Sequence, residues 1–168
     1  MPYRRELEVA LSIARRAGEI AMHYFAQDTG GEEEKSDLSP VTIADRECER
    51  LISRLVSDTF PEDGLVGEEG AFTASRSGRR WIIDPIDGTR DFVRRTPYWA
   101  VQIALEVESQ VVLGLIYLPA LNEMFHAMDG AGCYWNDDRI RASSISRWPL
   151  PSRPRLRPKP TTSPVSQP

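Results

Sequence analysis

Two aspartates that follow an apolar run are the residues of this chain best suited to chemistry. Asp84 and Asp87 stand three residues apart in the run Trp-Ile-Ile-Asp-Pro-Ile-Asp-Gly-Thr, which begins at Trp81. A second acidic pair, Glu68 and Glu69, lies between two glycines, with Glu68 16 residues before Asp84. Carboxylates are the hard oxygen ligands that Mg²⁺ and Mn²⁺ prefer. The sequence therefore predicts a divalent-cation site built from these acids.

The residues around the second aspartate are suited to binding an anion beside the metal. Pro85 fixes its own φ and stiffens the chain, and Ile86 offers a backbone carbonyl as a further oxygen ligand. Gly88 allows close backbone approach, and Thr89 begins a short helical stretch whose first N–H groups could hold a phosphate. A metal and amides that share one phosphoryl group favour its hydrolysis. Either acidic pair alone would be read as a solvated turn; the combined string is more specific.

The hydrophobic pattern predicts two helices followed by a series of strands. Apolar residues recur at helical spacing over residues 4–27 and 43–59, and residues 28–37 read as a mobile polar loop. Ser109-Gln110 favours a hairpin, and the run at 111–118 is apolar enough for a strand buried on both faces. Helices followed by antiparallel strands indicate an α+β fold. The expected strands are 65–68, 80–84, 99–108, 111–118 and 123–128.

Composition and charge indicate a single globular body followed by a different tail. The chain has 168 residues and a net charge of −4, and residues 1–146 hold all 25 acids against 16 basic residues. From residue 147 onward there are five basic residues, no acid and seven of the 13 prolines, so 147–168 is expected to be disordered. We expect no nucleic-acid partner and no membrane span, although a nucleic-acid binder acting through the basic tail stays an alternative. Two distant cysteines and no signal peptide predict a cytoplasmic protein.

Taken together, the motifs resemble the inositol monophosphatase family of Mg²⁺-dependent, lithium-sensitive phosphomonoesterases. The likeness covers roughly residues 5–146. It implies a layered α/β sandwich of the sugar-phosphatase type, with residues 1–146 as its N-terminal metal- and phosphate-binding part. A finer likeness to histidinol-phosphatase or inositol-phosphatase members rests on Trp99 and residues 132–136. The family-like pieces are residues 39–45 (Ser-Pro-Val-Thr-Ile-Ala-Asp), 67–69 and 81–89, Phe92, Pro97, residues 130–132 and Asn136.

The resemblance implies a metal-binding role for each acid of the two pairs. Glu68, Asp84 and the carbonyl of Ile86 would hold a first Mg²⁺, for which Mn²⁺ could substitute. Asp84 would bridge to a second metal that Asp87 also holds. Glu69 would support a loosely held third metal or the water network.

The resemblance also implies how water and phosphate are handled. Asp45 and Thr89 would orient and deprotonate the attacking water, and the amides of Gly88 and Thr89 would bind the substrate phosphate. Lys35 could approach the site, although a solvated lysine is the alternative. The implied substrate is a small alcohol phosphate, of the inositol monophosphate or histidinol phosphate type.

One departure from the family leaves two functions open. The family pattern continues to a Trp-Asp motif that completes the second metal site, and no Trp-Asp pair follows Thr89 in this chain. The chain is therefore expected to be either a phosphomonoesterase or a truncated, catalytically impaired remnant that binds metal weakly without turnover. A missing layer would expose the apolar face of residues 99–128, so that aggregation or a homodimer is expected. The tail is expected to be out-of-frame or foreign sequence, with a genuine short variant as the alternative.

Overall fold

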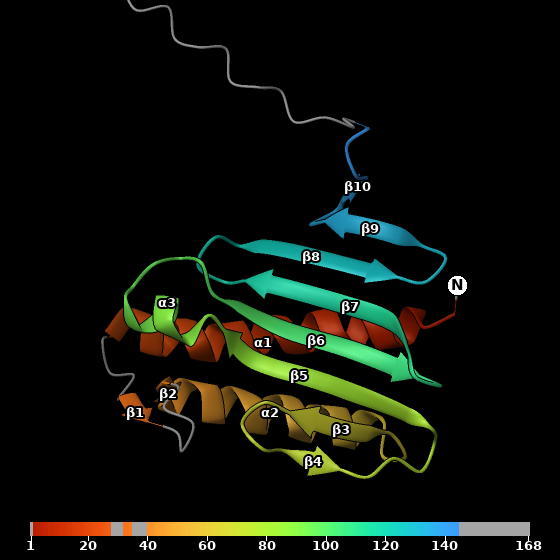
Figure 1. The fold of residues 1–168 in the computed structure, drawn as a ribbon, viewed down its shortest axis with the longest axis horizontal. Helices are drawn as coiled ribbons and strands as arrows, with labels where there is room; N and C mark the ends of the chain where they lie inside the picture. Colours follow the sequence, from red (N-terminus) through yellow and green to blue (C-terminus); the bar gives the residue numbers. More distant parts are fainter. Residues whose placement is uncertain (1, 28–31, 35–39, 145–168) are drawn as a thin grey trace, which may run out of the picture.

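A computed structural model describes residues 2–27, 32–34 and 40–144 of the chain. Two long helices, α1 (Arg4–Gln27) and α2 (Ile43–Thr59), lie side by side on one face of a large sheet (Figure 1). Both helices and the α+β class are as the hydrophobic pattern predicts. The predicted loop at 28–37 lies outside the described residues except for β1 (Glu32–Glu34), which pairs antiparallel with β2 (Pro40–Thr42). The predicted tail at 147–168 also lies outside them.

The large sheet has eight strands in the order β10-β9-β8-β7-β6-β5-β3-β4. The neighbours β3 and β5 are parallel, and each of the other adjacent pairs in this sheet is antiparallel. The five predicted strands are confirmed, whereas the short strands β4, β9 and β10 were not predicted. The strand bounds are β3 (Gly64–Gly67), β4 (Phe72–Thr73), β5 (Arg79–Asp87), β6 (Ala100–Val107), β7 (Gln110–Leu118), β8 (Glu123–Met128), β9 (Gly132–Trp135) and β10 (Asp138–Ile140).

The predicted hairpin connects β6 to β7 through a two-residue turn. Val107 pairs with Gln110, and the turn residues Glu108 and Ser109 both have positive φ, 49° and 64°. Positive φ at both turn positions matches the right-handed twist of the strands, which is why such turns are common in hairpins. The two central strands are thereby held in register along the sheet.

Small residues let α1 approach the sheet closely. Ala10, Ala14, Ala17 and Ala21 are all at most 1 % exposed on the face that α1 turns to the core. A Cβ on Gly18 would lie 2.6 Å from a ring carbon of Tyr117 on β7, so a side chain there would force the helix away. Close packing of this kind leaves few voids, and it fixes the helix layer against the central strands.

Within the described residues, the opposite face of the sheet is open and largely apolar. It carries a groove of about 560 Å³ lined by residues that include Ile82, Gly114, Ile116 and Phe125. Val111 is 64 % exposed and Ile116 42 %, so the prediction that β7 is buried on both faces is wrong. The sequence of β7 is apolar because one of its faces packs on α1 and the other lines the groove. The predicted exposure of this apolar face is confirmed, while aggregation and a homodimer stay predictions.

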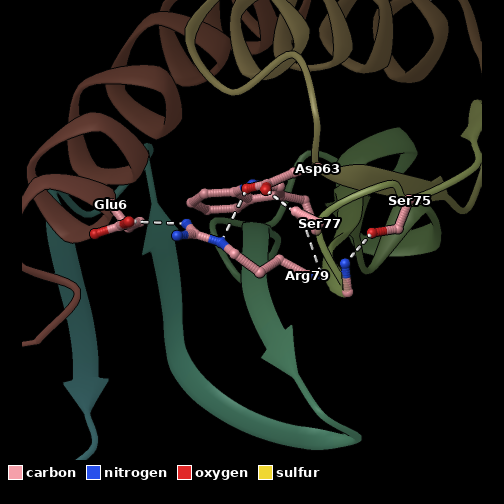
Figure 2. A network of polar contacts seen from close by, with 7 residues as sticks. Glu6, Asp63, Ser75, Ser77 and Arg79 are labelled. Carbon is pink, nitrogen blue, oxygen red and sulfur yellow. Dashed lines mark hydrogen bonds and ion pairs between the residues drawn. The ribbon is translucent and has the colours of Figure 1, made fainter.

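A network of charged and polar side chains anchors the start of β5 (Figure 2). Arg79 Nη2 donates to Glu6 Oε1 of α1 at 2.8 Å, and Arg79 Nε lies 3.2 Å from Asp63 Oδ2. Asp63, which is 8 % exposed, also accepts hydrogen bonds from Ser77 Oγ at 2.7 Å and from Trp81 Nε1 at 3.0 Å. The buried carboxylate is thus fully engaged, which is the condition under which such a charge is tolerated.

Candidate active site

A β-bulge brings the two predicted aspartates to the same face of the sheet. Side chains alternate along a strand, so residues 84 and 87 would normally point to opposite faces. In β5, however, Asp84 pairs with Gln102 and Asp87 pairs with Ala100, which leaves one extra residue in β5 between the two pairs. Pro85 has no N–H for the ladder and lies inside this bulge, buried beside Ile86. The strand predicted to end at residue 84 therefore continues through a bulge to Asp87, and the bulge places Asp87 on the same face as Asp84.

The parallel pairing of β3 and β5 brings Glu68 next to Asp84. Gly67 is in register with Ile83, and the N–H of Glu68 donates to the carbonyl of Ile83 at 3.1 Å. The carboxyl ends of the two strands therefore meet at one edge of the sheet. Glu68 and Asp84 both line the end of the apolar groove, on the face opposite the helices. Two of the acids of the predicted cation site thus lie at the ends of neighbouring strands.

The gathered carboxylates make Asp84 unusually hard to ionise. Partial burial raises the pKa of Asp84 to about 7, and the negative charges of Asp87, Glu68 and Asp45 add to the effect in that order. Asp45 reaches the site from the first turn of α2 and is only 1 % exposed. Four of the predicted residues thus share one electrostatic environment. A raised carboxyl pKa in such a cluster is typical of functional sites.

The donor set has the chemistry of a Mg²⁺ or Mn²⁺ site, although its side chains are loosely gathered. The cluster offers only oxygen ligands, and it concentrates negative charge that a divalent cation would offset. Among the described residues, no three His, Cys, Asp or Glu side chains come together closely enough to hold a metal ion. The residues present therefore fit the metal in type and charge. The ligand roles of Glu68, Asp84, Ile86 and Asp87 stay predictions.

The segment after the bulge brings the predicted carbonyl and hydroxyl together. Thr89 Oγ1 donates to the carbonyl of Ile86 at 3.2 Å, and α3 (Thr89–Val93) begins there, as predicted. Gly88 has a φ of 87°, and a Cβ there would lie 3.0 Å from the carbonyl oxygen of Tyr98. Glycine is thus required at 88 by the backbone angle and by the close approach. The roles predicted for the Gly88 and Thr89 amides and for Glu69 stay predictions, and Lys35 lies outside the described residues.

One residue in direct contact with the predicted ligands was not identified from the sequence. Gln102 of β6 donates a short hydrogen bond from its side-chain Nε2 to Asp87 Oδ2, and it also lines the groove beside Asp84. The signal in the sequence was a polar amide in the middle of an alternating apolar strand. Its importance depends on the bulge, because only the bulge turns Asp87 toward the same face.

Comparison with known proteins identifies the family of the chain. The chain belongs to the inositol monophosphatase family, whose model matches residues 3–159. A histidinol-phosphatase of Chlorobaculum parvum is 45 % identical over 141 residues, which are 84 % of this chain and 54 % of that protein. The inositol monophosphatase 2 of Solanum lycopersicum is 38 % identical over 148 residues, with 84 % of this chain and 55 % of that protein covered.

Solved structures show the same arrangement of elements. The SuhB protein of Bartonella henselae matches with a TM-score of 0.81 at 32 % identity, over 85 % of this chain and 56 % of that one. An inositol monophosphatase of Thermotoga maritima matches with a TM-score of 0.78 at 35 % identity, over 83 % of this chain and 54 % of that one. The chain spans about half the length of the curated relatives it matches.

Proposed function

We propose that the acid cluster at the ends of β3 and β5 is the metal- and phosphate-binding part of a Mg²⁺-dependent phosphomonoesterase site. The observation that carries this proposal is the bulge, which turns Asp84 and Asp87 to one face beside Glu68. A bulge and a concentration of like charge both cost stability, and such features are kept where function requires them. Membership of a phosphatase family supports the same assignment.

In this proposal the residues of the chain bind and orient the reactants. Glu68, Asp84, Asp87 and the Ile86 carbonyl would hold the cations, which, when bound, activate water and stabilise charge on the phosphoryl group. The Thr89 hydroxyl donates a hydrogen bond to the carbonyl of Ile86. Its oxygen keeps lone pairs that can accept a hydrogen bond from water. Asp45 is buried at the start of α2, within the electrostatic reach of Asp84, and is proposed to take the proton of the water.

The substrate is proposed to be a small alcohol phosphate. Relatives named histidinol-phosphatase and inositol monophosphatase support two chemical types, an amino alcohol phosphate and a cyclitol phosphate. A relative named fructose-1,6-bisphosphatase/inositol-1-monophosphatase extends the range to a sugar phosphate. The three types share a phosphate monoester on a small polar alcohol, which is the class that the acid cluster would act on.

A second candidate is metal binding without turnover. It is favoured by one observation: no three potential side-chain ligands converge within the described residues. A loose cluster with a cation of moderate affinity would still be stabilised by Mg²⁺, because a ligand that binds only the folded state raises the free energy of unfolding.

Phosphate release with the purified chain tests the proposal and separates the two candidates. Histidinol phosphate, inositol 1-phosphate and fructose 1,6-bisphosphate would each be incubated with and without Mg²⁺. The phosphomonoesterase predicts Mg²⁺-dependent release that disappears in Asp84→Asn. Titration with Mn²⁺ in the absence of substrate completes the test: binding without release supports the second candidate, and neither binding nor release rejects both.

A further inference from the structure

A buried carboxylate on α2, Glu49, lies directly behind the loop that carries the Gly-Glu-Glu motif. Glu49 is 4 % exposed and stands four residues after Asp45, on the same face of the helix. Its Oε2 accepts the N–H of Glu69 at 2.7 Å, and its Oε1 accepts the N–H of Ala71 at 2.8 Å. Each oxygen thus holds one backbone amide of the loop, and the two amides lie on either side of Gly70.

Besides the contacts with Glu49, the loop is held by backbone hydrogen bonds, from the N–H of Gly67 to the Ala71 carbonyl at 2.7 Å and from the N–H of Glu68 to the Ile83 carbonyl at 3.1 Å. It connects β3 to β4, a two-residue strand at the edge of the sheet whose residues are both exposed, with Phe72 at 74 %. Gly70 at the tip has a φ of 104°, which few other residues adopt. Side-chain packing therefore contributes little on the outer side of this loop. The two hydrogen bonds that Glu49 accepts hold the loop on its inner side, in addition to these backbone bonds.

The space behind the loop explains the glycine of the motif. A Cβ on Gly67 would lie 2.3 Å from Glu49 Oε2 and 2.5 Å from its Cδ, far inside van der Waals contact. The φ of Gly67 is not in the left-handed region, so its backbone angle alone does not require glycine. Gly67 is thus glycine because the Glu49 carboxylate lies against its Cα. The two residues form a matched pair.

The chemistry of this contact points to positioning more than to core packing. A leucine at position 49 would fill a similar volume without the cost of burying a charge. Replacing buried charged groups by apolar residues of similar volume is often neutral or stabilising. A carboxylate is useful here because it accepts two N–H groups at once, and charge-assisted hydrogen bonds are the stronger kind. One of the two peptides that it holds joins Glu68 to Glu69, so the contact lies next to the residue whose side chain lines the groove together with Asp84.

We propose that Glu49 is a positioning residue for the metal site, fixing the backbone from which the Glu68 side chain extends into the groove that Asp84 also lines. This inference rests on the proposed function, because it assigns to Glu68 the role of a ligand. Glu49 itself does not touch the cation or the substrate. It acts through the backbone amides of Glu69 and Ala71.

The test compares Mn²⁺ affinity in variants of two equally buried carboxylates. Asp63 is the matched control, since it is 8 % exposed and accepts two hydrogen bonds at the far end of β5. Glu49→Ala loses both amide bonds and is expected to weaken Mn²⁺ binding about 10- to 100-fold, as for other residues that orient ligands. Glu49→Gln keeps one acceptor oxygen and is expected to give an intermediate loss. Asp63→Asn is expected to lower thermal stability while leaving Mn²⁺ affinity within about twofold of the unaltered chain.

The contact between Gly67 and Glu49 supplies a second measurement. Gly67→Ala is expected to displace the Glu49 carboxylate and to weaken Mn²⁺ binding as much as Glu49→Ala. In the Glu49→Ala background the added methyl meets no carboxylate, so Gly67→Ala is expected to cause little further loss. Losses that instead multiply would show that the two residues act independently, and would overturn the assignment.

The outcomes separate this inference from the proposed function. If the unaltered chain binds no Mn²⁺, the proposed function fails and the positioning role fails with it. If the unaltered chain binds Mn²⁺ and the Glu49 variants bind it as well as Asp63→Asn does, the positioning role alone fails. Should Glu49→Ala not fold, Glu49→Gln carries the same comparison at a temperature where every variant is folded.

Discussion

The two ends of strand β5 differ in the charges that surround their acidic side chains. At its start, Arg79 lies between Glu6 and Asp63, and the Asp63 carboxylate receives further hydrogen bonds from Ser77 and Trp81 (Figure 2). At its end, like charges are gathered around Asp84, whose pKa rises to about 7. One strand of nine residues thus carries a neutralised cluster at one end and a repulsive cluster at the other.

The difference teaches which of the two clusters serves the fold. Opposite charges at the start of β5 connect α1, the loop after α2 and the sheet, so removing one partner leaves the others buried without compensation. Like charges at the end of β5 destabilise the folded state and are explained by a cation that they would bind. Substitutions at the start should therefore act on stability, and substitutions at the end on metal binding and catalysis.

The sharpest test of this division is Asp84→Asn. If the acid cluster binds the catalytic cation, losing this carboxylate should lower phosphate release on the order of 1000-fold, because a bound metal supplies several kcal/mol of transition-state stabilisation. The same substitution should stabilise the metal-free fold at pH 8 by about 1 kcal/mol, after allowance for the partial exposure of Asp84. Phosphate release and thermal unfolding, measured on one preparation, check both effects.

The control for this substitution is Asp58→Asn, which removes an exposed acid near the end of α2. It should leave both phosphate release and stability unchanged. An Asp84→Asn variant that is less stable than the unaltered chain, or equally active, would contradict the assignment of the end of β5 to function.

At the other end of the strand, Asp63→Asn should destabilise the fold without touching the site. The amide loses the charge that faces Arg79 and one of its two acceptor oxygens, and hydrogen bonds to charged groups are worth about 1.5–3 kcal/mol. We expect the free energy of unfolding to fall by about 2–3 kcal/mol, as measured with urea. A change in Mn²⁺ affinity of more than about twofold would mean that the two ends of β5 are coupled.

Much of the fold could be predicted from the sequence because its elements are strongly periodic. The apolar spacing in α1 and α2 and the alternation in β6 are local signals, and the structure confirms both helices and all five predicted strands. The strands β9 and β10 are short and exposed, so their apolar pattern was too weak to detect. The error about β7 has a different cause. Apolar residues on its outer side line an open groove, and composition alone does not distinguish this from burial.

The site was predictable in its residue types but not in its geometry. Asp84, Asp87 and Glu68 stood out by their residue type and by their spacing along the chain. The bulge at Pro85 and the contacts of Gln102 and Glu49 depend on register and on which helix face meets the sheet. These are tertiary relations between residues far apart in the sequence, and no local pattern encodes them.

A smaller effect is expected from Gln102→Leu at the functional end of the strand. Leucine fills a similar space in the apolar groove but cannot donate the hydrogen bond that orients Asp87. Loss of a residue that orients a ligand typically costs about tenfold in metal affinity, and we expect this in a Mn²⁺ titration. The matched control is Glu106→Gln, which removes the charge from the cross-strand pair with Arg80 between the same two strands. That exposed pair should contribute less than about 1 kcal/mol to the free energy of unfolding, and its loss should leave Mn²⁺ affinity unchanged.

The smallest predicted effect is a pH dependence of the free energy of unfolding, which we expect from Asp84 at the end of β5 and not from the charges at its start. Well below pH 3.8 the Asp84 carboxyl is protonated in both the folded and the unfolded chain, so it does not affect stability. As the pH rises toward 7, the unfolded carboxyl ionises at its ordinary pKa of 3.8 while the folded one keeps its proton, because its pKa is about 7. The folded state then binds more protons than the unfolded state, and the free energy of unfolding falls with pH. Well above pH 7 both forms are ionised and the loss is constant. Subtracting the unfolding free energies of Asp84→Asn from those of the unaltered chain isolates the contribution of Asp84 from that of the other carboxyls.

We expect this difference in unfolding free energy to decline between pH 4 and pH 7. The decline should flatten when Mg²⁺ is added, since the cation stabilises the ionised cluster. The same subtraction with Asp63→Asn should show no flattening by Mg²⁺, because the charges at the start of β5 are already compensated by Arg79.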